Sequence, residues 1–600
     1  MSQNKKYYTL STHKTLYFLW VATILFSATV FSSYAQISEG GIPPSFMYPA
    51  SQKTRSLQNK KNGIKNIYIP FSLDDLKADD ERMKEEFLPP RVAVLLPASF
   101  SPENSGAWST LPGGERIWQL RIMANKAKAI SLYYKKFNLP IGSKLFIYNS
   151  AHTHILGAYT HKTHPGKGKF ATEFVAGDDI ILEYVAPKSD EFPQNPEIEI
   201  EEIGYGYNYL SIKDSYNESL SGSCMVDINC EEGEQWQDHK NGVVKMIIPI
   251  GTSSFLCTGS ILNNTKEDLK PYLLTAFHCL LSSKEQASAS DLSQAQFFFR
   301  YENTTCGSNT PTSPVSMIGC TYIAGVPLEN GVDGALLLLK GKIPDNLNAY
   351  YNGWDRRNIA PQSGVCIHHP QGDVKKISTY DQPAVSDTWK SGSTQGLQDG
   401  HWNVIFKSTA NGHGVTEGGS SGAPLFDQNK RITGFLTGGN ANCTDRKEGR
   451  NLFGKLALFW DQCGTADDQR IDKYLDPIGS GVEYLDGRYA FPPKAVPEQV
   501  SAKWSSEEKR SIVNWEAPKG DEQPVRYKIY RNSTEIGTTT STSFSETALP
   551  VGIHHYDVTA IYADNKASDS GNTATIYVYD ILPPKNISIK RTDETELQIE

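Results

Sequence analysis

Apolar and polar residues alternate in short segments through much of the N-terminal third of the chain. Ile117–Ile122, Leu145–Tyr148 and Ile180–Tyr184 follow this pattern and are separated by turn sequences such as Leu139–Gly142. A period of two is typical of half-buried β-strands, and glycine and proline between such segments favour turns. Residues 36–218 are therefore predicted to be a β-rich N-terminal region built on a small antiparallel sheet.

The same short-strand pattern continues between residues 219 and 490. Val243–Ile248 and Ala335–Leu339 are predicted strands, and turn residues are frequent. Long helical patterns are scarce, and one short helix is predicted near Thr465–Leu475. The sequence thus predicts a mainly β fold for this region as well.

A further β unit is predicted over residues 497–580, after the proline-containing hinge Phe491–Pro497. Its strands Val513–Trp515, Tyr527–Arg531 and His555–Ile561 resemble those of a fibronectin type III sandwich. Residues 581–600 look like the start of another such module, too short to fold alone. We expect this C-terminal β-sandwich to contact a surface or a polymer, because nothing in it looks catalytic.

The first 35 residues have the features of a secretory signal peptide. Lysines precede an apolar stretch over Leu16–Phe31, and Ser33-Tyr34-Ala35 supplies small residues for cleavage. The alternative is a membrane anchor, but the stretch is short for a hydrocarbon core of roughly 30 Å and contains Thr and Ser. We expect a secreted, extracellular protein, with the bacterial cell surface or periplasm as alternatives.

Composition narrows the class of protein. The length of 600 residues predicts three to five domains. A net charge of −8 over that length argues against nucleic acid or an anionic membrane as the main partner. All nine cysteines lie between Cys224 and Cys463, and none forms a Cys-x-x-Cys pair. In an exported chain this distribution favours one disulfide-stabilised domain and gives no cysteine-built metal site.

A glycine-rich turn supplies a candidate nucleophile. Thr416–Pro424 places Ser421 in a Gly-x-Ser-Gly pattern. Acyl transfer needs a hydroxyl on a tight turn, with backbone N–H groups directed at the developing oxyanion, and glycine permits such a turn. The N–H groups of Gly419 and Ser421 are the candidate oxyanion hole. Alone, such a sequence is more often an ordinary loop.

A histidine beside a cysteine is the candidate general base. Leu274–Cys279 joins a strand-like run to His278, and Cys257 lies upstream, where a Cys257–Cys279 bridge would hold the histidine loop at its root. A base must lie within about 2.6–3.2 Å of its nucleophile, so a restrained loop suits this role. Four other histidines lack this setting: His368, His369, His401 and His413.

An acid completes the set. Asp333 precedes the apolar run Ala335–Leu339, and a buried carboxylate there can orient His278 and stabilise its imidazolium. The order His278, Asp333, Ser421 is that of chymotrypsin-like double β-barrels and differs from the subtilisin and α/β-hydrolase orders. The combination predicts a serine peptidase.

Residues 221–487 resemble the bacterial lysyl endopeptidases, a branch of the trypsin-like serine proteases. The matching segments, in order, are Ser221–Cys230, Cys257–Ser260, Thr275–Cys279, Tyr301–Cys306, Gly353–Arg357, Ile367–Pro370 and the Ser421 turn. The resemblance implies a chymotrypsin-like double β-barrel over residues 219–490, a cleaved propeptide over residues 36–218, protein or peptide substrates, and no cofactor.

The resemblance also implies a disulfide pattern. It pairs Cys224 with Cys443, Cys230 with Cys306 and Cys257 with Cys279. Cys320, Cys366 and Cys463 have no counterparts, and a Cys320–Cys366 bond that leaves Cys463 free is one further expectation.

The candidate specificity pocket departs from the family pattern. Lysyl endopeptidases have an Asp at the pocket base where this chain has Asn451, and a His at the pocket edge where it has Thr437; the partner Trp is retained as Trp389. An amide lacks the full charge that offsets the desolvation of a buried ammonium. Glu417 is the remaining acid near the pocket. Cleavage after Lys or Arg is one expectation, and if Glu417 faces the catalytic loops, a neutral or polar residue before the cut is favoured.

Two other function classes compete with an active peptidase. A catalytically inactive binding or adhesion homologue would lack a triad residue or the oxyanion glycine, and this chain retains them all. An esterase would place its serine in Gly-x-Ser-x-Gly before a helix, whereas Ala423 and the run Leu425-Phe426 follow here. A metallopeptidase would carry a motif such as His-Glu-x-x-His, which the sequence does not contain.

Overall fold

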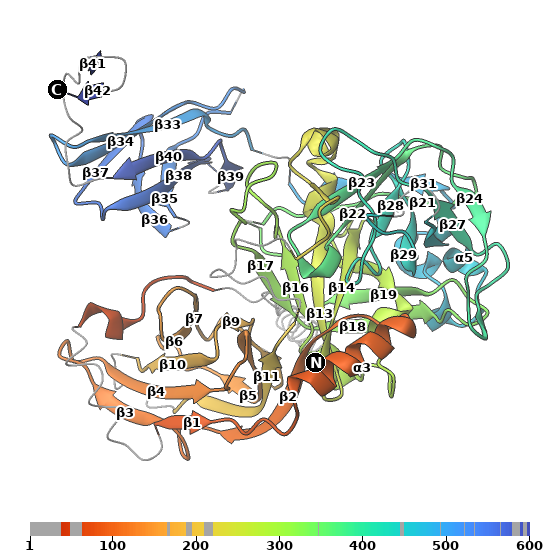
Figure 1. Cartoon of the computed structure of the whole chain (residues 1–600), viewed down its shortest axis with the longest axis horizontal. Helices are drawn as coiled ribbons and strands as arrows, with labels where there is room; N and C mark the ends of the chain where they lie inside the picture. The colour runs from red at the N-terminus through yellow and green to blue at the C-terminus, as the bar shows by residue number, and fades with distance from the viewer. Residues whose placement is uncertain are drawn as a thin grey trace, which may run out of the picture.

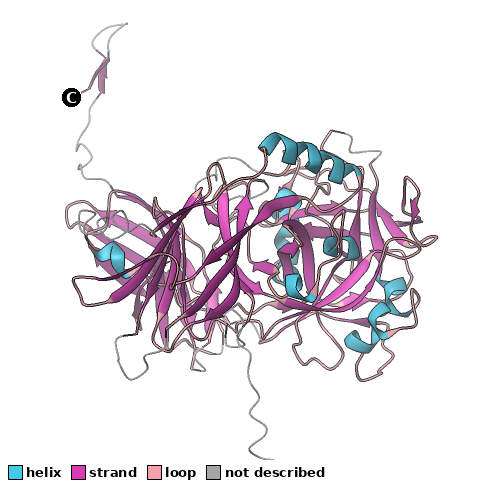
Figure 2. Ribbon diagram, turned by 90° about the horizontal axis from the view of Figure 1, so that it is seen from below, coloured by secondary structure: helices cyan, strands magenta, loops and turns pink. Residues whose placement is uncertain are grey.

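The computed structural model is mainly β, as Figure 2 shows, so the predicted fold class is confirmed. It describes residues 38–48, 63–164, 168–187, 195–208, 220–345, 347–444, 449–491, 494–520, 522–532, 534–563 and 566–578, and the backbone of residues 589–591 and 597–599. The predicted signal peptide, most of the polar Gln52–Lys65 stretch and most of residues 581–600 lie outside the described residues.

The N-terminal unit consists of two packed sheets. Tyr134, Trp118 and Leu182 contribute to the apolar cluster between them, because every second residue of each strand faces inward. One sheet contains β1 (Ile64–Asn66), β3 (Ala107–Thr110), β4 (Arg116–Met123), β6 (Lys144–Asn149), β7 (Ile155–Tyr159) and β10 (Asp179–Val185). The other contains β2 (Arg91–Phe100), β5 (Ala129–Asn138), β8 (Phe170–Ala171), β9 (Val175–Ala176) and β11 (Glu197–Gly206).

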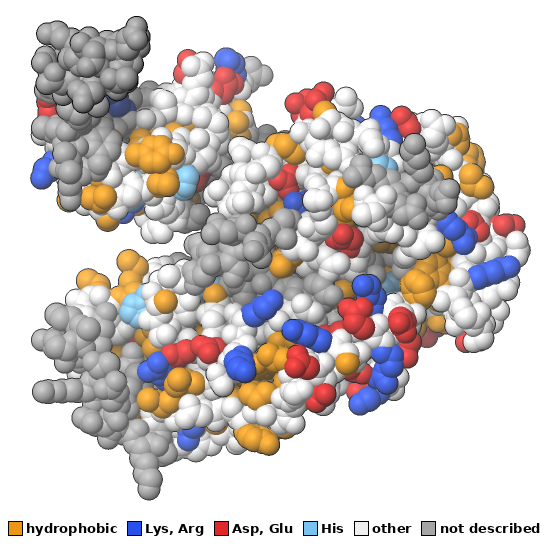
Figure 3. Space-filling view, in the orientation of Figure 1, with side chains coloured by type: hydrophobic (Ala, Val, Ile, Leu, Met, Phe, Trp, Pro, Cys, Tyr) orange, Lys and Arg blue, Asp and Glu red, His pale blue; other side chains and the backbone are white. Residues whose placement is uncertain are grey.

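The N-terminal unit also contains a helix that the alternation pattern did not predict. Helix α3 (Leu73–Glu85) is capped at its N-terminus by Ser72, whose Oγ accepts the N–H of Asp75 at 3.0 Å. Of its side chains only Met83 is buried, and Figure 3 shows charged side chains of both signs over the surface where Figure 1 places α3. A short 3-10 turn, η1 (Pro44–Met47), precedes it.

The next unit is a barrel-like sheet with an apolar core. Its strands follow the order β17, β16, β13, β14, β15, β19, β18, and their buried side chains include Met246, Leu273 and Leu337. The strands are β13 (Val243–Ile250), β14 (Ser253–Leu262), β15 (Tyr272–Ala276), β16 (Gln296–Phe299), β17 (Val315–Ile318), β18 (Cys320–Val326) and β19 (Gly334–Leu339). Short helical turns flank them: η2 (Glu231–Trp236), η3 (His239–Gly242), η4 (Phe277–Leu280) and α4 (Ala289–Leu292).

A second sheet of the same kind lies beside the first. Its main path runs β12, β23, β22, β28, β29, β30, β27, β24. Its strands are β12 (Val226–Asp227), β21 (Trp354–Asp355), β22 (Gly364–His368), β23 (Lys376–Tyr380), β24 (Val385–Asp387), β27 (His401–Val404), β28 (Pro424–Phe426), β29 (Ile432–Gly439), β30 (Asn451–Lys455) and β31 (Tyr484–Leu485).

Short elements complete this region. They are β20 (Tyr350–Tyr351), β25 (Lys390–Ser391), β26 (Thr394–Gln395), β32 (Arg488–Tyr489), η5 (Pro370–Gly372), α5 (Leu456–Asp461), η6 (Asp467–Gln469) and α6 (Asp472–Leu475). The single short helix predicted near Thr465–Leu475 is therefore two separate turns, η6 and α6, while α5 was not predicted.

The N-terminal unit and the first barrel share one sheet. Strand β2 pairs with β11 on one side and with β14 on the other, where Ser253 lies opposite Val94 and Ser254 opposite Ala93. Figure 1 shows β2, β11 and β5 running on into the barrel strands. The edge of the barrel at β14 is thereby covered by main-chain pairing.

The C-terminal unit is a two-sheet sandwich. Trp515 and Val513 of one sheet pack with Tyr556 and Ile529 of the other. Figure 1 shows it in blue as a separate body. Its sheets contain β33 (Glu498–Ser505), β34 (Arg510–Glu516) and β37 (Ser543–Thr547), and β35 (Arg526–Arg531), β36 (Thr534–Thr539), β38 (Gly552–Ile561), β39 (Ala567–Ser570) and β40 (Ala574–Val578). A pair of strands, β41 (Ile589–Arg591) and β42 (Leu597–Ile599), follows.

The cysteines require one correction. The structure contains the bonds Cys224–Cys443, Cys230–Cys306 and Cys257–Cys279. The expected Cys320–Cys366 bond is wrong, because both cysteines are free. Cys320 lies in the core of the first barrel and Cys366 in a separate apolar cluster of the second, so the two thiols are held apart. Cys463 is also free.

Candidate active site

His278 and Asp333 form a double hydrogen-bonded pair. His278 Nδ1 lies 2.7 Å from Asp333 Oδ2, and the backbone N–H of His278 donates to Asp333 Oδ1 at 2.9 Å. Because a carboxylate accepts, Nδ1 carries the proton and Nε2 is left as the acceptor. Asp333 has no solvent exposure. This is the arrangement that orients a general base.

Local structure fixes both partners. Asp333 has a φ of 63°, a left-handed conformation that Asp tolerates better than most residues, and its carbonyl accepts the N–H of Phe277 at 2.8 Å. His278 lies in the turn η4, and the neighbouring Cys279 is bonded to Cys257 of β14. Backbone and disulfide therefore restrain the loop that carries His278.

The Ser421 turn approaches this pair from the second barrel. The carbonyl of Ser421 accepts the N–H of Thr258 at 2.9 Å, and Cys279 Sγ lies 3.6 Å from the same oxygen. Gly422 has a φ of +80°, and a Cβ there would lie 2.8 Å from the backbone nitrogen of Ala276. Only glycine lets the turn pack against the strand that leads to His278.

The atoms that would react are free of other partners. In the described ranges, the Ser421 hydroxyl makes no hydrogen bond, and the N–H groups of Gly419 and Ser421 donate to no protein group. Their neighbours are used: Ser420 N–H donates to Glu417 and Gly422 N–H donates to Leu436. Nucleophile and base often approach more closely only when substrate binds.

A second buried histidine supports the turn. His368 Nδ1 lies 2.7 Å from Ser420 Oγ, and Nε2 lies 3.1 Å from Ser378 Oγ. Because Ser378 donates to the carbonyl of Val415, His368 donates from Nε2 and accepts the Ser420 proton at Nδ1. Burial lowers the pKa of His368 to about 3, so the ring is neutral at pH 7.

Sequence reasoning treated His368 only as a histidine without a catalytic setting. Its sole signal was the position of Ile367–Pro370 among the family motifs. The contact with Ser420 spans 52 positions, which no local pattern could have revealed.

Glu417 is directed toward the segment that follows residue 219. Both carboxylate oxygens accept the backbone N–H of Gly222 at 3.2 Å, and a Cβ on Gly222 would lie 2.6 Å from Glu417 Oε1. The adjacent Ser221 donates from Oγ to Asp373 at 2.7 Å. Burial raises the pKa of Glu417.

Asn451 and Thr437 lie on the neighbouring strands β30 and β29. Asn451 is 1% exposed; its Oδ1 accepts the Thr416 hydroxyl at 2.9 Å, and its Nδ2 donates to the carbonyl of Val404 at 3.1 Å. Thr416 begins the turn that carries Ser421, so Asn451 contacts that turn as a neutral group. The structure thus brings Asn451 to the turn and directs Glu417 elsewhere.

Thr437 contacts a buried histidine. His401 Nε2 lies 3.1 Å from Thr437 Oγ1, and burial lowers the pKa of His401 to about 4. Trp389 packs over Gly438, where an added Cβ would lie 3.1 Å from its ring. Within the described part of the chain, neither the indole N–H of Trp389 nor His401 Nδ1 has a hydrogen-bond partner.

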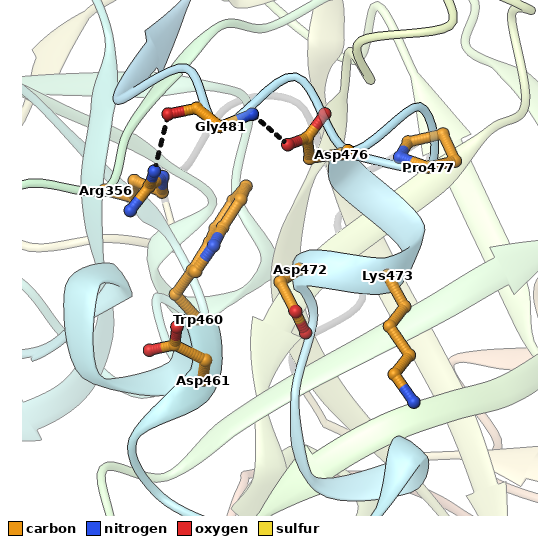
Figure 4. A pocket seen from close by; sticks show the side chains of 9 residues that line it. Arg356, Trp460, Asp461, Asp472, Lys473, Asp476, Pro477 and Gly481 are labelled. Atoms are coloured by element: carbon orange, nitrogen blue, oxygen red, sulfur yellow. Dashed lines mark hydrogen bonds between the residues drawn. The ribbon is translucent and has the colours of Figure 1, made fainter.

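A surface pocket lies elsewhere, on the second barrel. Figure 4 shows Trp460 between Arg356 and the acids Asp472 and Asp476, in a cavity of about 390 Å³. Arg356 donates a hydrogen bond to the carbonyl of Gly481, and Asp476 accepts the N–H of Gly481, so both charged groups already have hydrogen-bond partners within the protein. Among the described residues, no group of three or more His, Cys, Asp or Glu side chains could hold a metal ion, and no helix is both long and apolar enough to cross a membrane.

Comparisons with known proteins find similarity in the region around this site. Residues 219–454 match the family model for the lysyl endopeptidase C-terminal domain. The chain is 30% identical to the lysyl endopeptidase of Pseudomonas aeruginosa over 315 residues, which is 50% of this chain and 62% of that protein. It is 22% identical to secreted RxLR effector protein 73 of Plasmopara viticola over 267 residues, 42% of this chain and 62% of that protein.

Among solved structures, a thermostable serine protease from an extremophilic microorganism is similar, with 15% identity and a TM-score of 0.26 over 36% of this chain and 91% of that one. The chain spans about three fifths of the length of the two curated relatives. The comparisons therefore associate residues 219–454 with the lysyl endopeptidase C-terminal domain.

Proposed function

We propose that this protein is the precursor of a secreted serine endopeptidase with His278, Asp333 and Ser421 as its triad. The observation that carries the proposal is the His278–Asp333 pair, made by two hydrogen bonds in a site with no exposure of the acid. The Ser421 turn, from the second barrel, contacts Ala276 and Cys279, residues on either side of His278. Sequence similarity to a lysyl endopeptidase supports the same reaction class.

The residues suggest the course of the reaction. Ser421 Oγ transfers its proton to His278 Nε2 and attacks the substrate carbonyl carbon, and Asp333 stabilises the imidazolium. The oxyanion accepts hydrogen bonds from the N–H groups of Gly419 and Ser421. His278 then protonates the leaving amine, and a water molecule hydrolyses the acyl-enzyme by the reverse path.

The pocket contacts favour a neutral residue before the cut over Lys or Arg. Asn451 is uncharged, and its acceptor oxygen is occupied by Thr416. Glu417, the acid that could have compensated, accepts the N–H of Gly222 instead. A lysine ammonium entering beside Asn451 would lose its hydration without a full opposite charge.

The remaining regions fit a zymogen. Residues 36–218 are proposed as a propeptide, because their sheet covers an edge of the barrel, and residues 219–490 as the protease domain. Residues 1–35 are proposed as a signal peptide, in keeping with three disulfides that persist outside the cytosol. The C-terminal sandwich is proposed as a fibronectin type III-like module that contacts a surface or polymer.

A peptide-library digest tests the activity and its specificity. The chain, folded in an oxidising compartment and allowed to mature, would be incubated with a mixed peptide library beside the Ser421→Ala variant, and mass spectrometry would identify the residue before each cut. We expect cuts after neutral residues that vanish in the variant. Absence of cuts, or cuts that persist equally in Ser421→Ala, would favour an inactive binding homologue. Cuts after Lys or Arg that vanish in the variant would contradict the preference for a neutral residue.

A further inference from the structure

Residues Phe87–Pro90, here the crossing segment, join α3 to β2 and touch both barrels beside the active site. At one end the Phe87 ring meets the Trp389 ring edge-on, with centroids 5.1 Å apart. At the other end the Pro90 carbonyl accepts the N–H of Leu256 at 2.9 Å. Trp389 covers Gly438 of the candidate pocket, and Leu256 directly precedes the disulfide-bonded Cys257.

Between these ends, the crossing segment lies against the catalytic turn. A Cβ built on Gly418 would meet the Pro90 ring at 2.8 Å, and its three nearest atoms all belong to Pro90. Gly418 directly precedes Gly419, a candidate oxyanion donor. The segment therefore extends from the pocket wall to the oxyanion side of the site.

The flanking side chains bind the segment to the first barrel. Met83, in the last turn of α3, is 4% exposed and belongs to the apolar core of that barrel, with Phe255 and Cys279. Leu88 packs against the same cluster. The N-terminal unit thus contributes side chains to the core beside the histidine loop.

A buried arginine links the two elements that flank the crossing segment. Arg91, the first residue of β2, donates to Asp80 at 3.0 Å, to Tyr207 at 2.9 Å and to the carbonyl of Leu76 at 3.2 Å. Two of these partners lie on α3, so α3 and β2 are tied together on either side of the segment. Phe87 has a φ of 58°, a conformation unfavourable for a bulky residue, which these restraints hold in place.

We propose that the crossing segment is a preformed inhibitor that occupies the peptide-binding cleft of the protease. Its Pro90 carbonyl accepts the N–H of Leu256. An extended peptide substrate would otherwise use this main-chain donor at the edge of the barrel. Its Phe87 ring covers Trp389. Peptide chains then reach Ser421 only after the crossing segment has lifted off. This inference rests on the proposed peptidase function and adds the segment and the contacts by which access is controlled.

The test measures access to Ser421 in the intact chain. Chain purified before processing, with its length verified by mass, would react with a dye-linked fluorophosphonate, which modifies a reactive serine. Phe87→Gly removes the ring contact and suits the positive φ. We expect Phe87→Gly to be labelled about three- to tenfold faster than the unaltered chain. Tyr68→Ala, which removes an aromatic ring that is 83% exposed on the same unit, is the matched control and should leave the rate unchanged.

A double-mutant cycle tests the contact at Gly418. Gly418→Ala forces a methyl group against Pro90, and Pro90→Ala removes the ring atoms that it meets. Each change alone should speed labelling, and the double variant should be slower than the product of the two effects predicts, because the residues are in contact. If the effects of the two changes on the labelling rate were additive in free energy, the proposed contact between Gly418 and Pro90 would be contradicted.

The outcomes separate the two proposals. No Ser421-dependent labelling or hydrolysis in any variant would refute the peptidase function itself. Ser421-dependent labelling that is equally fast in the unaltered chain, Phe87→Gly and Pro90→Ala would leave the peptidase standing and overturn the inhibitory segment.

Discussion

At the scale of single residues, Asn451 is a neutral side chain beside the Ser421 turn. Replacing it with Asp would place a carboxylate where the Thr416 hydroxyl already donates at 2.9 Å. A buried carboxylate is stabilised by a cation that enters the site, so Asn451→Asp should favour lysine or arginine before the cut. We expect the ratio of basic to neutral cleavage sites to rise about tenfold or more in the library digest.

The size-matched variant Asn451→Leu controls for this experiment. It also breaks the hydrogen bonds to Thr416 and Val404 but adds no charge, so it should lower activity without a gain at basic sites. If Asn451→Leu and Asn451→Asp changed specificity in the same way, the position would act through packing and the electrostatic explanation would fail.

Residue types and their order along the chain were sufficient to propose the triad. They were not sufficient to predict the direction in which each side chain points. His278, Asp333 and Ser421 were identified because each sits in a short motif and the three follow one order. Glu417 could not be assigned, because its partner Gly222 is 195 positions away. Thr416 was overlooked as a partner of Asn451 because a buried hydroxyl leaves no periodic signal in the sequence.

At the scale of elements, the Cys257–Cys279 bond ties the histidine turn η4 to β14. It closes a loop of 22 residues, for which chain entropy gives about 3 kcal/mol of stabilisation. Changing both cysteines to serine should lower the melting temperature and also the kcat/KM of the folded fraction, because His278 is adjacent. Differential scanning and peptide hydrolysis below the melting transition would measure both effects.

The Cys230–Cys306 bond is the matched control. It lies outside the catalytic turns and closes a loop of 76 residues, so its removal should destabilise the chain at least as much. Its kcat/KM should stay near that of the unaltered chain once the folded fraction is accounted for. An equal loss of kcat/KM in both variants would show that the Cys257–Cys279 bond has no specific positioning role.

Helix α3 illustrates which elements the pattern could and could not predict. Strands such as β11 alternate over part of their length because one face is buried, and barrel strands such as β13 are almost entirely apolar because both faces are buried. Helix α3 buries only Met83, so it lacks the apolar stripe that predicts an amphipathic helix. Ser72 before Asp74-Asp75, and the prolines Pro89-Pro90 beyond the end, were the available signals. The pairing of β2 with β14 joins strands far apart in sequence and is set by edges that meet only in the fold.

At the scale of the whole molecule, buried histidines should make the chain sensitive to acid. Burial lowers the pKa of His239 to about 4, of His401 to about 4 and of His368 to about 3. An unfolded histidine binds a proton below about pH 6.5, whereas these folded rings stay neutral. The unfolded state therefore binds more protons between pH 6.5 and 4, and stability falls as the pH falls through that window.

The free energy of unfolding of the Ser421→Ala chain, measured by denaturant titration from pH 7 to pH 4, tests this directly, because that variant lacks the proposed nucleophile. His239 packs among the rings of Trp236, Tyr350 and Phe426, so His239→Phe removes one titrating group and keeps an aromatic ring there. Each proton that binds only the unfolded state changes the free energy of unfolding by about 1.4 kcal/mol per pH unit. Between the two pKa values, the slope of the free energy of unfolding against pH should therefore be shallower by that amount in His239→Phe. An identical slope in the two chains would mean that His239 becomes protonated in the folded state, and that its burial does not exclude charge from the seam between η3 and the second barrel.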